Sequence, residues 1–255
     1  MNRTGFDDDT VITGAKESHA DFADLGYIET DKDAETEKNF RYFTSTRDRF
    51  YFYDEVENAK VMNEALQKIY DEMAGFAKDT KETAHNDVFG EESWYDLDDP
   101  DAWCPAYSYD VNLGTAVRIG SHHVEVSLDD YAYYGGAHGM PGIRHILFDT
   151  ATGKEISMKD LFKGSEKEFR DIVVQYSMDD WKNSGEYKYY ESYDPSLEKE
   201  MKQGFEDIAS FDMIIRYDKD GIYAEYSPYA VGPFASGFID VFVPYSALGI
   251  EEEMK

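Results

Sequence analysis

The chain of 255 residues carries 54 acidic against 25 basic side chains, which gives a formal net charge of −29 at pH 7. Hydrophobic residues make up 42% and aromatic residues 16%, as is typical of a globular protein with one large domain or two small ones. So acidic a chain disfavours nucleic acid as a partner and favours a cationic one; the alternative is that the acidity only keeps the protein soluble. Cys104 is the only cysteine, which excludes an internal disulfide, and no apolar run is long enough for direct membrane insertion.

The first half of the chain begins with a polar, acidic segment, 1–38, which we expect to be a flexible leader or tether. The aromatic stretch 39–53 predicts one strand or a hairpin. Apolar residues at intervals of three and four then predict a helix whose Met and Phe side chains belong to the core. Residues 85–110 are typical of an acidic, aromatic loop. The apolar stripe of the helix consists of Ala59, Met62, Leu66, Ile69, Met73 and Phe76.

Two strands follow, predicted by alternating apolar residues around a tight turn at Gly120-Ser121. Residues 143–158 predict a strand, a turn in which Gly153 takes a positive φ, and another strand. Ser165 and Glu168 form a capping box that starts a helix, and a further helix is expected after Asp194-Pro195.

Strand patterns at 211–218, 221–227 and 238–245 close the chain. We therefore expect an α+β fold of two intimately packed α/β lobes, at 39–142 and 143–255. Each lobe would be a mainly antiparallel sheet with one or two helices.

The stretch GGAHGMPG, residues 135–142, contains the candidate residue His138. Gly135 and Gly136 free the backbone for conformations closed to other residues, and Pro141-Gly142 is typical of a further turn. Imidazole also suits a metal ligand or a general base. That chemistry needs partners at a defined spacing, and the sequence has no HExxH pattern. We therefore favour a turn in which His138 bonds to neighbouring backbone, with a site as the alternative.

Other signatures of enzymes and metal sites are absent from the sequence. The acidic run DLDDPD has Asp101 where a calcium-binding EF-hand loop carries glycine, so a solvated loop is expected. Nucleophile-elbow, phosphate-loop and dinucleotide-binding patterns do not occur. We expect no metal and no cofactor.

Two acidic segments rich in tyrosine and tryptophan, 94–109 and 180–194, are candidates for recognition. Rigid rings lose little entropy on contact and make good anchors for a partner. The alternative is that these rings pack onto the core. The candidate binding residues are Trp94, Tyr95, Trp103, Trp181, Tyr187, Tyr189, Tyr190 and Tyr193.

Three segments carry a resemblance to a known family: VEVSLDDYAYYGGAHG at 124–139, ILFDTATGKEISMKDLF at 146–162 and SPYAVGPFASGFIDVFVPYSAL at 227–248. They resemble the RsiV-like domain family, which shows an aromatic strand, a GGAH turn, a D-x-x-T-G-K hairpin and a DLF helix start. The helix containing Met62-Asn63 is similar to the PdaC-type N-terminal half of such domains. The matching motif positions are Gly135, Gly136, Ala137, His138, Asp149, Thr152, Gly153, Lys154, Asp160, Leu161 and Phe162.

The resemblance implies a two-lobed fold in an exported protein that is secreted, or anchored by a segment outside this sequence. The family includes the lysozyme-binding part of an anti-sigma factor, and lysozymes of that type are strongly basic, in agreement with the net charge. The sequence shows no sigma-binding or deacetylase segment, so we do not expect those activities from it.

These observations lead to one main hypothesis and two alternatives. The main hypothesis is a non-enzymatic, extracytoplasmic binding or sensing module for a cationic wall-active protein such as lysozyme, or for a cell-wall glycan. One alternative is a cell-wall hydrolase or esterase that uses His138 with a nearby carboxylate such as Asp129 or Asp130. The other is a structural accessory domain without a ligand.

Overall fold

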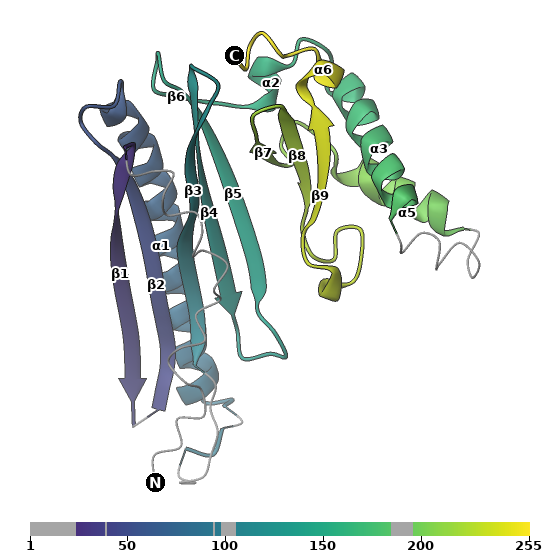
Figure 1. Ribbon diagram of the computed structural model, residues 1–255. Coiled ribbons are helices and arrows are strands. Elements are labelled where there is room, and N and C mark those ends of the chain that lie inside the picture. Colours follow the sequence, from purple (N-terminus) through teal and green to yellow (C-terminus); the bar gives the residue numbers. More distant parts are fainter. Residues whose placement is uncertain (1–23, 39, 94, 98–105, 185–195) are drawn as a thin grey trace.

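The computed structural model describes residues 24–38, 40–93, 95–97, 106–184 and 196–255. It contains a six-stranded and a three-stranded β-sheet with helices packed against them (Figure 1). The α+β class expected from the sequence is confirmed. Each sheet has its own hydrophobic core, and the two cores lie on opposite faces of the larger sheet's β3–β5 region.

The larger sheet follows the chain order, and its neighbouring strands pair antiparallel except for the parallel pair β2–β3. A parallel pair needs a long crossover, and helix α1 (Ala59–Phe89) supplies it. The strands are β1 (Gly26–Glu37), β2 (Phe40–Phe52), β3 (Tyr107–Ile119), β4 (His123–Tyr133), β5 (Met140–Asp149) and β6 (Lys154–Ile156).

Helix α1 is longer than the sequence analysis predicts, because buried residues recur with helical spacing up to Val88. Residues 85–89 therefore belong to the helix and not to the predicted loop. The prediction that Phe76 is a core residue is wrong, since its side chain is 48% exposed. Tyr70 and Ala77 are buried instead, one position beyond Ile69 and Phe76.

Strand β1 corrects the expectation of a flexible leader for residues 26–37. Three of its acidic side chains form ion pairs. Asp31 binds Arg49 of β2, and Asp33 and Glu35 lie 3.3 and 3.0 Å from Nζ of Lys81 in α1. Alternating charge on an edge strand is compatible with pairing on one side and solvent on the other. The rest of the predicted leader, 1–23, lies outside the described residues.

The smaller sheet consists of β7 (Ile214–Tyr217), β8 (Gly221–Tyr226) and β9 (Ile239–Pro244), all antiparallel. Helices α3 (Glu166–Asn183) and α5 (Leu197–Ile208) lie against the face of this sheet that points away from the larger one (Figure 1). The predicted capping box of Ser165 and Glu168 at the start of α3 is confirmed. Three short helices complete the lobe: α2 (Met158–Leu161), η1 (Phe234–Ser236) and α6 (Tyr245–Leu248).

The expected boundary between residues 142 and 143 falls inside β5, which pairs with β4 along its whole length. The larger sheet continues to Ile156 at the end of β6. The buried residues of the second core all lie at or after Met158, except Ile119 and Leu147. These two residues lie on the larger sheet, so the smaller lobe packs directly on that sheet.

Candidate functional site

The GGAH stretch forms the connection between β4 and β5, and the ring of His138 is fixed there by three contacts. Nδ1 lies 3.0 Å from the carbonyl oxygen of Gly139. A carbonyl only accepts, so Nδ1 is the donor, while Nε2 lies 3.3 Å from the hydroxyl of Tyr229. The imidazole also stacks on Phe234, with ring centroids 3.7 Å apart and planes at 17°.

Tyr229 belongs to the loop between β8 and β9, and its backbone conformation is unusual. Its φ is +70°, in the left-handed region that bulky residues rarely adopt. Its side chain is nevertheless 58% exposed, so burial of the ring does not account for the strained backbone. We define the three side chains His138, Tyr229 and Phe234 as the aromatic cluster.

The aromatic cluster joins the two lobes at one end of their interface, since His138 comes from the larger sheet's β4–β5 connection and the other two rings from the smaller sheet's β8–β9 loop. The hairpin itself is held by its own tyrosines. Tyr133 donates to the carbonyl of Gly136 at 2.9 Å, and the Gly139 N–H donates to the hydroxyl of Tyr131 at 2.9 Å. His138 is thus presented by a braced turn.

A second contact between the lobes is a buried cluster of charges centred on His145 of β5. Its Nε2 lies 3.1 Å from Oε2 of Glu225 on β8, and its Nδ1 lies 3.4 Å from Oε1 of Glu125 on β4. The three side chains are only 1–3% exposed. Arg216 of β7 binds the other oxygen of Glu225 at 2.9 Å, and the backbone N–H of Tyr217 donates to Glu125 at 2.5 Å. We call these residues the charge cluster.

The charge cluster fixes the protonation of its members. Burial opposes a positive charge on His145, but the carboxylates of Glu125 and Glu225 outweigh it and raise the pKa of His145 to about 9. Burial likewise raises the pKa of Glu225, but the hydrogen bonds and charges of His145 and Arg216 outweigh burial, so that the pKa is lowered. At neutral pH His145 is therefore positively charged, and it lies between Glu125 and Glu225. This arrangement suits a structural clamp, because its groups are shielded from any substrate.

The hydrolase alternative needs a carboxylate beside His138. Within the described residues, the partners of the His138 ring are Gly139, Tyr229 and Phe234, none of which is acidic. Burial raises the pKa of both Asp129 and Asp130. The charges that lower their pKa values against this effect are those of His145 for Asp129 and of Arg144 for Asp130.

The predicted recognition residues are only partly described. Tyr95 is half-buried against the first core, and Trp181 is 9% exposed in α3 within the second core. These two rings therefore pack onto the cores, which is the alternative that the sequence left open. The other six candidates, Trp94, Trp103, Tyr187, Tyr189, Tyr190 and Tyr193, lie outside the described residues, as do Asp101 and Cys104.

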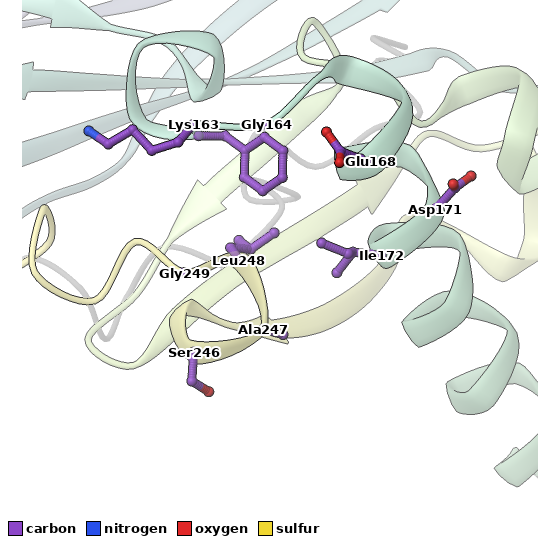
Figure 2. A pocket seen from close by; sticks show the side chains of 10 residues that line it. Lys163, Gly164, Glu168, Asp171, Ile172, Ser246, Ala247, Leu248 and Gly249 are labelled. Atoms are coloured by element: carbon purple, nitrogen blue, oxygen red, sulfur yellow. The ribbon is translucent and has the colours of Figure 1, made fainter.

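Surface hollows offer little enclosure. One, of about 520 Å³, lies between the start of α3 and α6; Figure 2 shows Lys163, Glu168 and Asp171 around the apolar side chains of Ile172 and Leu248. A hollow of about 350 Å³ lies between β5–β6 and β7. In the described part of the chain, no group of three or more His, Cys, Asp or Glu side chains is placed to hold a metal ion. Among the same residues, no helix is long and apolar enough to span a bilayer.

The charge cluster and the role of the β8–β9 loop are not predicted from the sequence. Glu125 and Glu225 are charged residues within apolar strand patterns, VEV and YAEY, and that conflict is the signal that could have found them. Tyr229 and Phe234 were noted only as part of a family resemblance, since a positive φ on tyrosine has no signature in a single sequence.

The fold, a two-sheet α+β architecture with a long crossover helix, is shared with solved bacterial structures. A member of the DUF3298 family from Bacteroides fragilis is similar with a TM-score of 0.59 at 15% sequence identity, covering 89% of this chain and 94% of that chain. A DUF3298 family protein from Pseudomonas aeruginosa gives a TM-score of 0.52 at 16% identity, covering 88% and 93%. No family model matches the sequence, and no curated protein matches it significantly.

DUF3298 proteins are domains of the RsiV and PdaC type, so these neighbours agree with the resemblance at the level of the fold. At 15–16% identity the structural similarity shows the fold alone. A specific relation to the lysozyme-binding member stays a prediction.

Proposed function

We propose that the protein is a non-catalytic binding module that acts outside the cytoplasm and recognises a strongly cationic wall-active protein of the lysozyme type. The observation that carries this proposal is the formal net charge of −29. Such a charge steers basic proteins toward the surface, and the attraction weakens as salt screens it.

The fixed state of the candidate histidine also supports binding over catalysis. The ring of His138 is stacked and hydrogen-bonded by uncharged groups, which suits a rigid recognition surface. A general base in a hydrolase requires a partner that orients it and a site for the reacting atom. In the described residues, His138 instead contacts the aromatic rings of Tyr229 and Phe234.

Calorimetric titration with a cationic lysozyme at about 20 mM and about 150 mM salt tests the proposal, because the Debye length shortens over that range. We expect binding at both salt concentrations, with a clearly higher Kd at the higher one. Lysozyme with its lysines succinylated, which reverses their charge, is the control and should not bind. Absence of heat at both salt concentrations contradicts the proposal.

A cell-wall glycan is the competing ligand, and the same experiment separates it. A soluble chitin oligosaccharide carries no positive charge, so its affinity would change little with salt. Binding of the oligosaccharide without binding of lysozyme would replace the protein partner by a glycan. Release of products from wall fragments, lost in His138→Ala with the fold intact, would establish the hydrolase alternative.

A further inference from the structure

We infer that the aromatic cluster of His138, Tyr229 and Phe234 is the anchor site for a guanidinium or ammonium side chain of the basic partner. This inference rests on the proposed function and assigns it a location. The net charge of the molecule favours a basic partner but does not indicate where on the surface that partner binds.

Backbone strain is the first observation that points to a site at Tyr229. Left-handed φ values on non-glycine residues in the described chain occur at Lys38, Asn58 and Tyr229. Lys38 lies between β1 and β2, and Asn58 precedes α1 and bonds the carbonyl of Thr150 at 2.8 Å. Tyr229 differs because its strained backbone presents a ring that is 58% exposed. Strained backbone that the fold maintains is concentrated at binding sites.

The second observation is that the exposed ring is held in place before any partner arrives. The Tyr229 hydroxyl bonds Nε2 of His138, which is itself fixed by Gly139 and by the stack on Phe234. Tyr229 and Phe234 also touch, with centroids 5.5 Å apart. A ring that is already ordered loses little entropy on binding, and this is a property of anchor residues in interfaces.

The third observation concerns charge. Neither of the two segments that build the cluster, 131–142 and 227–238, contains Lys, Arg, Asp or Glu. The cluster is therefore carried by segments without these charged side chains, on a molecule whose formal net charge is −29. No lysine or arginine of these segments competes for the ring faces, while the acidic remainder draws cations toward them.

The chemistry of an aromatic face then selects the ligand group. A cation within about 6 Å of a tyrosine or phenylalanine centroid is attracted by the ring quadrupole, and arginine is used most often. The protein contains this interaction internally, where the guanidinium of Arg216 lies 3.9 Å from the ring centroid of Tyr223. The exposed ring of Tyr229 offers the same interaction to a second molecule.

Titration of a cationic lysozyme into three variants tests the assignment. Tyr229→Ala removes the ring and should raise the Kd about 5- to 30-fold, as loss of an interfacial cation–π anchor does. Tyr229→Phe keeps the ring and should stay within about threefold of the parent. Tyr134→Ala is the matched control, because Tyr134 is 50% exposed at the same hairpin but outside the cluster, and it should leave the Kd within about twofold. Circular dichroism verifies that each variant is folded.

The outcomes separate this inference from the proposed function. If Tyr229→Ala binds lysozyme like the parent, the anchor is overturned while the binding function stands. If the parent binds neither lysozyme nor an arginine-rich peptide, both are overturned. If Tyr229→Ala loses a chitin oligosaccharide but keeps lysozyme, the cluster is a sugar site and the cation anchor is wrong.

Discussion

A tyrosine held at a φ of +70° lowers the stability of the fold, since the left-handed region costs a non-glycine residue about 1–2 kcal/mol. The ring contacts of Tyr229 with His138 and Phe234 offset part of this cost. Retaining a tyrosine here is understandable when its ring binds something. The strain itself can be tested by comparing the stability of two variants that lack the ring.

We predict that Tyr229→Gly is more stable than Tyr229→Ala by about 1 kcal/mol, because glycine adopts the left-handed conformation without strain. Urea unfolding of the two variants measures the difference, and both variants lack the ring. The same pair at Tyr134, whose φ is not positive, is the control. There alanine should be the more stable by about 0.5–1 kcal/mol, because glycine loses more backbone entropy on folding. The same order of stability at both positions would contradict the strain argument.

At the scale of elements, the β5–β6 turn is packed against the start of α1. Gly153 has a φ of +68°, and a Cβ added there would lie 2.8 Å from the Cβ atoms of both Asn58 and Val61. Gly237, after the short helix η1, has a φ of +65° but open space around it. The two glycines have nearly the same backbone conformation and differ in their surroundings.

We expect Gly237→Ala to lower the free energy of unfolding by about 1 kcal/mol, the cost of the left-handed conformation alone. Gly153→Ala should lower the free energy of unfolding by about 1–3 kcal/mol more than Gly237→Ala does, because the added methyl group overpacks the contact with α1. Chemical denaturation of both variants measures the difference. Equal losses would show that the turn can move away from α1 and that the contact does not position the helix.

The elements that the sequence predicts well are those with a local cause. Gly153 takes the predicted positive φ, at +68°, Gly120 lies in the predicted turn, and the capping box at Ser165 forms as its spacing requires. Hairpins and helix starts depend on a few neighbouring residues, so one sequence suffices to find them.

The features that the sequence did not predict depend on partners distant in the chain. Strand β1 looks disordered by composition; it pairs with β2, and its acidic side chains also bind Lys81 of α1, which is 48 and 46 residues away from Asp33 and Glu35. His145 binds Glu225, which is 80 residues away in the chain, so no local pattern predicts the pair. The aromatic cluster likewise joins residues 91 positions apart.

At the scale of the whole molecule, the charge cluster links the stability of the two-lobed fold to pH. The pKa of His145 is raised from its ordinary value of about 6.5 to about 9, so the histidinium stabilises the fold fully below about pH 6.5. This contribution is lost as the pH rises through 9. Glu225 has a lowered pKa, so its contribution is present above its ordinary pKa and is lost on acidification. Asp129 and Asp240 lie in the same field and have raised pKa values, chiefly through burial.

We predict that the free energy of unfolding falls between about pH 6.5 and pH 9.5, and that His145→Gln removes most of this fall. At pH 7 the variant should be less stable by about 3–5 kcal/mol, because two buried carboxylates lose their common partner. His122→Gln, which changes an exposed histidine, is the control and should retain the parent's pH profile. Parallel profiles for the parent and His145→Gln would contradict the assignment of the clamp to His145.

If a basic protein binds at the aromatic cluster on this acidic two-lobed fold, lysozyme must change the surroundings of these rings. Hydrogen–deuterium exchange of the protein alone and with a cationic lysozyme, at about the parent's Kd and at saturation, measures this change. We expect protection at saturation to be concentrated in 134–140 and 227–238, the segments that contain His138, Tyr229 and Phe234, and protection at about the parent's Kd to be clearly weaker in Tyr229→Ala. Unchanged exchange in both segments, with lysozyme demonstrably bound, would contradict it.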